Sequence, residues 1–230
     1  MLQGKQTRLR RELSLRQTLL VLLAAVALGC TGYAGWLFYL DWKLKQEVST
    51  AWPIMMDAAR AQRDSIEAAI EKYHAHFGFY PPDHVLSRNP LWVEPVTNSL
   101  LYELGGTSYD PVRKTFANPR VDHVTPAALQ ETYQIVAFTN AVTPTDSLRE
   151  FLTLDGFGFT GLHDDPDLVA LQLPIYVDAV SADAASEFAG STSWCYVATG
   201  ATNNPGKYDL WMVLRTDERA VVIGNWPAAR

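Results

Sequence analysis

Cysteine is scarce in this chain, which has only two in 230 residues, Cys30 and Cys195. Cys30 lies inside a long apolar run near the N-terminus, whereas Cys195 lies in the acidic part of the chain that follows. Two thiols in such different surroundings do not predict a disulfide. We therefore expect the folded part of the chain to be stabilised by packing.

Several catalytic signatures are also missing. No Gly-x-Ser-x-Gly elbow occurs, so the chain lacks the nucleophile turn of the α/β-hydrolases. The stretch "GFGFTG", residues 156–161, has alternating glycines, but no lysine follows it as a phosphate loop requires. Cys195 stands between Trp194 and Tyr196 in an apolar run, which favours a packed thiol over a reactive one. We expect no enzymatic activity, no catalytic residue and no cofactor.

Basic residues are few in the larger part of the chain. Up to Pro53 there are seven Lys or Arg against three Asp or Glu, whereas residues 54–230 carry 12 against 22. Because nucleic acids bind to a basic face, this acidic body excludes nucleic acid as a partner.

What the sequence does have is a long run without charge. Residues 17–40 read "QTLLVLLAAVALGCTGYAGWLFYL", and at a rise of about 1.5 Å per residue they would extend ~36 Å, enough to cross a bilayer. Trp36, Tyr39 and Trp42 gather at one end, as interfacial aromatic residues do. Five basic residues precede the run, so the positive-inside rule places residues 1–16 in the cytoplasm and the acidic body on the other side of the membrane. The sequence thus predicts a single-pass membrane protein.

An apolar run near the N-terminus can also be a signal peptide or a lipoprotein leader. A cleaved signal peptide has a shorter apolar core and a small-residue cleavage site. Lipid attachment at Cys30 is a second alternative, but "ALGC" imitates a lipoprotein processing site poorly, and apolar residues continue beyond it.

The apolar run is followed by an amphipathic helix. Apolar residues recur at steps of three and four, and charged residues fall between them; the apolar set is Ile66, Ala69, Ile70, Tyr73 and Phe77. Pro53 is interpreted as a kink in a helix that continues from the membrane, so residues 41–77 extend the anchor. Gly78 can adopt the left-handed conformation that ends a helix, and Pro81 and Pro82 prevent its resumption. A globular head is expected from residue 78 to 230.

The head is predicted to be rich in turns first and in strands later. Between residues 83 and 130 only residues 98–106, "NSLLYELGG", indicate a short helix. The strand candidates are residues 132–138, 169–177, 193–199, 208–216 and 220–226, and Pro174 places the second of them at a sheet edge. The last three predict an antiparallel meander. The expected fold class is α+β, with one long helix packed on a small C-terminal antiparallel sheet.

Histidines and carboxylates offer one candidate metal site. His163, Asp164, Asp165 and Asp167 stand close together in "GLHDDPDL", but consecutive side chains diverge, and a solvated acidic turn accounts for them. His74 and His76 are two residues apart on a helix and cannot chelate together, and His84 and His123 stand alone in loops. We expect no metal site.

Two stretches resemble a known family. "AAIEKYHAHFGFYPPD", residues 68–83, is similar to the helix end of type IV pilin-like proteins, which finishes in Gly-x-Tyr-Pro. "TNNPGKYDLWMVLRTDERAVVIGNW", residues 202–226, resembles the C-terminal strands of that family, above all of the major pseudopilins of type II secretion systems. The resemblance implies a pilin-like fold, a structural role in a fibre, and a location in the bacterial inner membrane with the head in the periplasm.

The chain departs from the family's pattern at two sites. The processing motif is a glycine followed by Phe-Thr-Leu-Ile-Glu, but here Glu12 stands in place of the glycine and Gln17 in place of the glutamate. The family's C-terminal loop binds calcium, and here it is reduced to "RTDER". Asp217 and Glu218 between two arginines provide too few oxygens for an ion that takes six to eight.

The sequence therefore leads to two hypotheses of different class. The first is a pseudopilin-like subunit that packs helix to helix with other pilin-like subunits and the secretion machinery, with inter-subunit ion pairs drawn from Arg60, Arg63, Asp64, Glu67 and Lys72. The second is a permanently anchored periplasmic binding or scaffold module that forms no fibre, on which Trp92, Trp194 and Trp211 could line a ligand surface. A third, a membrane-tethered hydrolase, would need His163 and its acidic neighbours.

Overall fold

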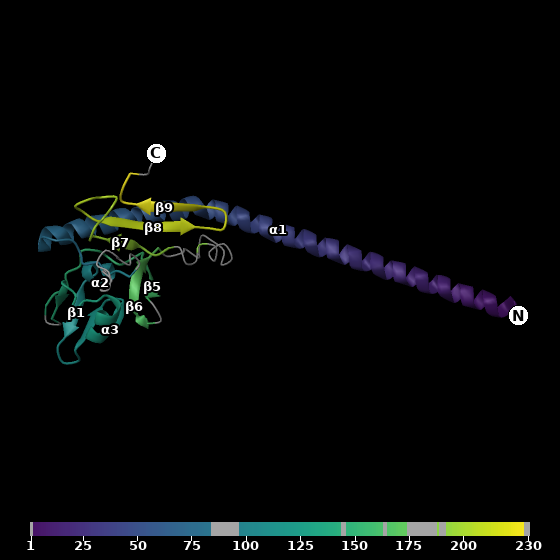
Figure 1. Cartoon of the computed structure of the whole chain (residues 1–230), viewed down its shortest axis with the longest axis horizontal. Coiled ribbons are helices and arrows are strands. Elements are labelled where there is room, and N and C mark those ends of the chain that lie inside the picture. The colour runs from purple at the N-terminus through teal and green to yellow at the C-terminus, as the bar shows by residue number, and fades with distance from the viewer. Residues whose placement is uncertain are drawn as a thin grey trace. The chain divides into compact units, whose positions relative to one another are not determined.

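The computed structural model describes residues 2–83, 97–143, 146–162, 165–173, 188 and 192–227. Among these, nothing is stated of the side chains of residues 2–19, 21, 24, 25, 122, 160, 162 and 165–168. The chain forms two compact units, residues 1–49 and residues 50–230. Long helix α1, Leu2–Phe77, runs through the first unit and into the second (Figure 1).

The part of α1 within the second unit buries one face, as its periodicity predicts. The buried residues recur every three or four positions, which places them on one side of a helix; they are Ala51, Met55, Ala59, Gln62, Ile66, Ala69, Ile70 and Tyr73. The helix continues through Pro53, as predicted, although proline has no N–H to donate to the carbonyl four residues before it.

The end of α1 is also confirmed. Gly78 has a φ of +82° and its N–H donates to the carbonyl of His74 at 2.8 Å, so the glycine closes the last turn in the left-handed conformation. An added Cβ at Gly78 would meet no neighbouring atom, so its role is conformational.

In the described residues of the second unit, three sheets and two short helices follow α1. The strands are β1 (Thr107–Asp110), β2 (Thr115–Asn118), β3 (Val121–Val124), β4 (Ala141–Val142), β5 (Gly158–Leu162), β6 (Asp165–Gln172), β7 (Cys195–Val197), β8 (Asp209–Arg215) and β9 (Ala220–Gly224). The helices are α2 (Leu100–Leu104) and α3 (Pro126–Thr132). The sheet orders are β3-β2-β1-β4, β5-β6 and β7-β8-β9, and all neighbours are antiparallel except β1 and β4. The class is α+β, as expected.

The C-terminal meander lies against α1 (Figure 1). Burial alternates along β8, where Leu210, Met212 and Leu214 are fully buried on one face of the sheet. Arg63 of α1 donates to the carbonyl of Gly224 at 3.1 Å, and Trp194, just before β7, donates its indole N–H to Oε1 of Gln62 at 3.1 Å. The long helix is therefore packed against the C-terminal antiparallel sheet.

The predicted meander and short helix are confirmed, whereas one predicted strand is wrong. Residues 132–138 form no strand: Thr132 ends α3, and Gln134 has a φ of +55°. The helix is started by Thr125, whose side chain accepts from the N–H of Ala128 at 3.2 Å, and by Pro126 in its first turn. Tyr133 and Phe138 are buried beside Tyr102, whereas Val136 between them is 77% exposed, so only the two ends of the run fill the core.

The turn-rich interpretation of residues 83–130 missed the three strands β1 to β3. Each of these strands has only four residues. The polar residues and prolines of the turns between them dominate the sequence there and indicated turns. Strand β5, which includes most of "GFGFTG", was missed too. Residues 84–96 and the second half of the candidate strand 169–177 lie outside the described residues, but β6 confirms its first half.

Candidate assembly surface

Residues 20–42 of α1 carry exposed apolar side chains on all sides. Phe38 is 79% exposed and Leu28 is 74% exposed. Of the predicted interfacial aromatics, Tyr39 and Trp42 lie 6.2 Å apart between ring centroids, and Trp36 lies 6.1 Å from Tyr33. Over the residues whose side chains are described, no helix combines the length and apolar character that crossing a membrane requires. The predicted span, residues 17–40, begins on residues outside that set.

A second exposed surface is the outward face of α1 in the second unit. It follows steps of three and four residues and is made of small side chains with one lysine; its members are Ala61, Ser65, Ala68, Lys72 and Ala75, all exposed. Lys72 has no charged partner among the described residues. We call this set the outward stripe.

The other charged residues predicted for inter-subunit pairs contact groups of their own chain. Arg60 pairs with Asp57 at 3.1 Å, and Arg63 pairs with Asp64 at 2.6 Å and Glu67 at 3.3 Å. Burial raises the pKa of Glu67, and the nearby guanidinium of Arg63 partly offsets this rise. Because Arg63 also binds the carbonyl of Gly224, it stabilises the contact between α1 and β9.

The residues that follow α1 are attached to the C-terminal sheet. The hydroxyl of Tyr196 donates to the carbonyl of Pro81 at 2.8 Å, and Asp83 accepts from the N–H groups of Ala198 and Thr199 at 2.8 and 2.6 Å. Tyr80 packs on Tyr208, with ring centroids 5.1 Å apart. The two stretches that carry the family resemblance are therefore in direct contact.

A buried carboxylate lies under α1. Glu103 of α2 is fully buried and accepts from the hydroxyl of Tyr73 at 3.0 Å and from the N–H groups of Thr139 and Asn140 at 2.8 and 2.9 Å. Burial raises the pKa of Glu103, and these three donors oppose the rise. Desolvation and the nearby Glu103 raise the pKa of Tyr73 well above 10, so its hydroxyl remains a donor. Sequence reasoning missed this group, because nothing in "NSLLYELGG" shows that its glutamate is turned inward.

The histidines and acidic residues considered as a metal site can be followed only in part. His163 and Asp164 lie outside the described residues, and only the backbone of Asp165 and Asp167 is described, in β6. The ring of His74 stacks on that of Tyr80 with centroids 4.3 Å apart, and the ring of His76 lies edge-on to that of Phe77 with centroids 4.6 Å apart. His123 lies in β3, and His84 lies outside the described residues. Among the described residues, no group of three or more His, Cys, Asp or Glu could hold a metal ion.

Cys195 lies near two of the three tryptophans that were candidates for a ligand surface. Cys195 lies in β7 as expected, and burial raises the pKa of its thiol to about 11. Trp194 is fully buried, so it cannot line a ligand surface, contrary to the second hypothesis. Trp211 is half-buried and packs on Trp226 with ring centroids 5.9 Å apart, and Trp92 lies outside the described residues.

The loop before β8 is organised around one carboxylate. Asp209 is 3% exposed and accepts from the N–H groups of Thr202, Asn203 and Asn204 at 2.9 Å each. Its oxygens thus accept hydrogen bonds and stabilise the loop. Asp217 and Glu218 are exposed in the turn between β8 and β9.

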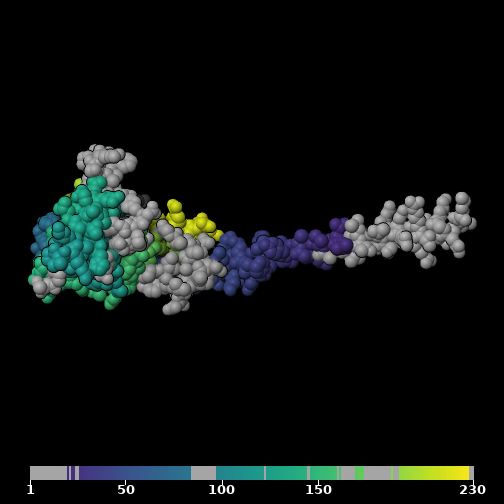
Figure 2. Space-filling model, turned by 90° about the horizontal axis from the view of Figure 1, so that it is seen from below, coloured from purple at the N-terminus to yellow at the C-terminus, as the bar shows by residue number. Residues whose placement is uncertain are grey.

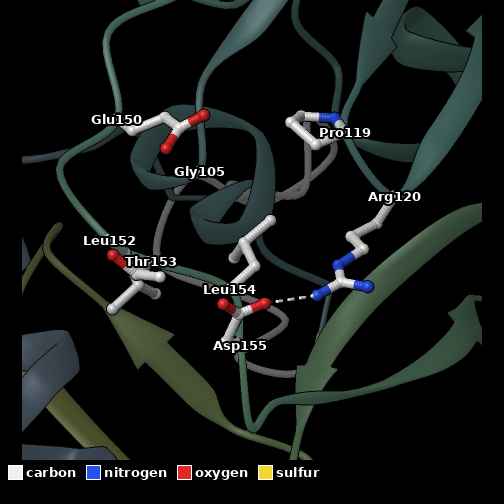
Figure 3. Close-up of a pocket in the computed structure, with 8 residues that line it drawn as sticks. All are labelled: Gly105, Pro119, Arg120, Glu150, Leu152, Thr153, Leu154 and Asp155. Atoms are coloured by element: carbon white, nitrogen blue, oxygen red, sulfur yellow. Dashed lines mark hydrogen bonds and ion pairs between the residues drawn. The ribbon is translucent and has the colours of Figure 1, made fainter.

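A shallow hollow of about 220 Å³ lies beside α2 (Figure 3). Its floor includes Leu152 and Leu154, and Arg120 and Asp155 form an ion pair of 3.0 Å at its rim. Figure 2 shows one face of the second unit, where the teal residues that follow α2 and the green residues of β5 and β6 form the surface. The carboxylate of Asp155 thus neutralises the guanidinium of Arg120 at the rim of the hollow.

Comparison of the chain with protein-family models, with curated proteins and with solved structures found no match.

Proposed function

We propose that the chain is a pilin-like structural subunit, anchored in the bacterial inner membrane by residues 17–40, that packs helix to helix with other subunits of a type II secretion or type IV pilus-like assembly. In this proposal residues 1–16 are cytoplasmic, residues 41–77 extend the anchor and residues 78–230 form a periplasmic head. The role is structural, so it involves no catalytic residue, cofactor or metal.

The observation that carries the proposal is the contact between the two stretches that resemble the family. The helix end, residues 68–83, and the C-terminal strands, residues 202–226, are far apart in sequence. They meet through the rings of Tyr80 and Tyr208, and Lys207 lies 3.7 Å from Glu71. A helix that ends at a left-handed glycine and packs on a C-terminal meander is the arrangement that the resemblance implies.

The two faces of α1 support assembly through helices. One face is buried against the head, while the outward stripe is exposed and composed mostly of Ala and Ser, which allow another helix to approach closely. Lys72 supplies a cation without a charged partner among the described residues, and Asp57 supplies a carboxylate that is 77% exposed. Two parallel helices with an axial offset would place Lys72 of one beside an acidic residue of the next, which gives the assembly a register.

The second hypothesis, a permanently anchored scaffold module, is favoured by one observation. Glu12 stands where a pilin-like processing site has glycine, and Gln17 stands where it has glutamate. A chain that is never cleaved would remain a fixed anchor with the same head.

Mass spectrometry of the N-terminus after purification from membranes tests the proposal. A chain that starts at Leu13 with a methylated amine supports a fibre subunit. An intact start supports the permanent anchor, and a lipid on Cys30 supports lipoprotein processing; both contradict the proposal.

A further inference from the structure

The hydrogen bonds around β9 show which of its backbone groups face outward. Asn225 N–H donates to the carbonyl of Leu210 at 3.0 Å, and Thr216 N–H donates to the carbonyl of Arg219 at 2.8 Å. Because paired groups alternate along an antiparallel ladder, the same register turns the backbone groups of Val221 and Ile223 toward β8. The N–H and carbonyl groups of Ala220, Val222 and Gly224 therefore point away from β8. β9 is the last strand in the sheet order β7-β8-β9 (Figure 1).

Only one of these outward groups has a partner among the described residues. The carbonyl of Gly224 accepts from Arg63 at 3.1 Å, whereas no hydrogen bond joins the outward groups of Ala220 and Val222 to the described part of the chain. The side chain of Val222 is 54% exposed and that of Val221 is 36% exposed. Within the described part of the chain, no backbone partner covers this half of the β9 edge.

The opposite edge of the same sheet is closed. The register of β7 on β8 turns the backbone groups of Trp194, Tyr196 and Ala198 away from β8, and Tyr196 between the other two is fully buried. Trp194 N–H donates to the carbonyl of Leu171 at 3.0 Å, and Ala198 N–H donates to Oδ2 of Asp83 at 2.8 Å. The sheet thus protects one edge with its own chain and leaves the other available.

β9 also lacks the features that keep edge strands from pairing. Proteins protect such edges with Lys, Pro, bulges or a covering segment. β9 reads "AVVIG", without a charge or proline, and pairs with β8 in an unbroken register. The strand's sequence therefore favours an added strand.

We propose that β9 binds an extended segment of a different protein, which adds a fourth strand to the sheet β7-β8-β9. Main-chain groups of that segment would bind the outward groups of Ala220 and Val222, and its apolar side chains would cover Val222. Arg219 stacks over Trp52 at 4.0 Å and has no carboxylate partner among the described residues, so an acidic residue in the segment would lie beside it.

A second copy of the chain does not fit this edge, an exclusion that rests on the proposed anchor. Arg219 contacts Trp52 and Gly224 contacts Arg63, so β9 runs in the same direction as α1. A closed pair of identical edges is two-fold symmetric and antiparallel, which makes the two α1 helices run in opposite directions. Two chains anchored in one membrane have α1 helices that run in the same direction.

Amide hydrogen exchange of the full chain in detergent micelles tests the proposal. The probe is a peptide of alternating valine and threonine with a glutamate at one end, and the control peptide has proline as its central residue. In the free chain, the Val222 amide is expected to exchange much faster than the ladder amides of Val221 and Ile223. The probe should slow exchange at Val222 about tenfold or more, and the control peptide should not.

Two variants separate strand addition from other binding. Val222→Pro removes an outward N–H and none of the ladder bonds to β8, so it should abolish protection by the probe. Val222→Lys places a charge on the edge and keeps the backbone, so it should weaken protection even if the proline variant does not fold. Val222→Thr is the matched control and should bind as the parent chain does.

Three results would overturn the proposal. In the first, the Val222 amide of the free chain already exchanges as slowly as the Val221 amide, and in the second, the probe leaves the exchange rate of Val222 unchanged. In the third result, protection of Val222 appears only when the concentration of the chain itself is raised. The last would assign the edge to a second copy. None of these three results depends on whether the chain is cleaved before Leu13. Hydrogen exchange therefore tests strand addition, and mass spectrometry of the N-terminus tests the proposed function separately.

Discussion

The hydroxyl of Tyr73 on α1 donates a 3.0 Å hydrogen bond to Oε2 of Glu103 on α2, and both side chains are fully buried. The carboxylate is also held by the N–H groups of Thr139 and Asn140. A single buried group thus joins the long helix, a short helix and the chain that leads into β4.

Removing this donor should destabilise the head. Tyr73→Phe keeps the ring contacts with Phe77 and Phe151 but leaves Glu103 with one donor fewer. Loss of a hydrogen bond to a buried charged group should lower the free energy of unfolding by about 1.5–3 kcal/mol. Urea unfolding of the full chain in detergent measures it, and Tyr109→Phe, at a half-buried tyrosine of β1, is the control. An equal effect of both substitutions would contradict the role of the Glu103 bond.

The raised pKa of Glu103 predicts how stability depends on pH. For an acid whose pKa is higher in the folded than in the unfolded state, the stabilising contribution is complete below the unfolded pKa, here 4.5, and is lost as pH rises through the folded pKa. The parent chain should therefore lose stability above pH about 4.5 relative to Glu103→Gln, which does not ionise. Parallel unfolding curves across this window would contradict a raised pKa.

Gln62 provides a second prediction within α1. Its Nε2 donates to the carbonyl of Gly156 at 2.6 Å, and its Oε1 accepts from the buried indole N–H of Trp194. Gln62→Leu would leave both groups without partners, at a cost of about 1–3 kcal/mol each. Gln130→Leu, at an exposed glutamine of α3, should change the free energy of unfolding by less than about 0.5 kcal/mol. Thermal unfolding distinguishes the two, and similar midpoints would refute the bridging role.

The end of α1 supplies a third prediction. Gly78→Ala places a Cβ in the left-handed region and should cost about 1 kcal/mol, although there is space for the methyl group. Gly78→Asn should cost less, because asparagine tolerates this conformation. Equal effects would indicate that crowding, not backbone conformation, selects the glycine.

Local signals accounted for the parts of the fold that were predicted. The buried stripe of α1, its end at Gly78, the helix α2 and the meander β7-β8-β9 follow from periodicity and from glycine and proline positions within a few residues of each element. The predicted strand at residues 132–138 was wrong because an apolar run fits a strand and an irregular segment that buries only Tyr133 and Phe138 equally well. Strands β1 to β3 were missed because four-residue strands carry little periodicity.

The contacts that hold the candidate surface together could not be read from sequence. Arg63 was assigned to neighbouring subunits, but it lies 161 residues from its partner Gly224 in the chain, a distance over which no local pattern operates. The inward orientation of Glu103 depends in the same way on Thr139 and Asn140. The open edge of β9 needed the register of the whole sheet.

The most direct test of the central claim is cross-linking from the outward stripe in native membranes. In a chain with Cys30→Ser, Ser65→Cys places a thiol on the exposed face of α1, and Val112→Cys places one on the turn after β1, where Val112 is 90% exposed. A thiol-reactive cross-linker should join chains carrying Ser65→Cys to neighbouring subunits, and should do so far less for Val112→Cys. Equal cross-linking from both positions, or none from Ser65→Cys, would contradict assembly through the outward face of α1.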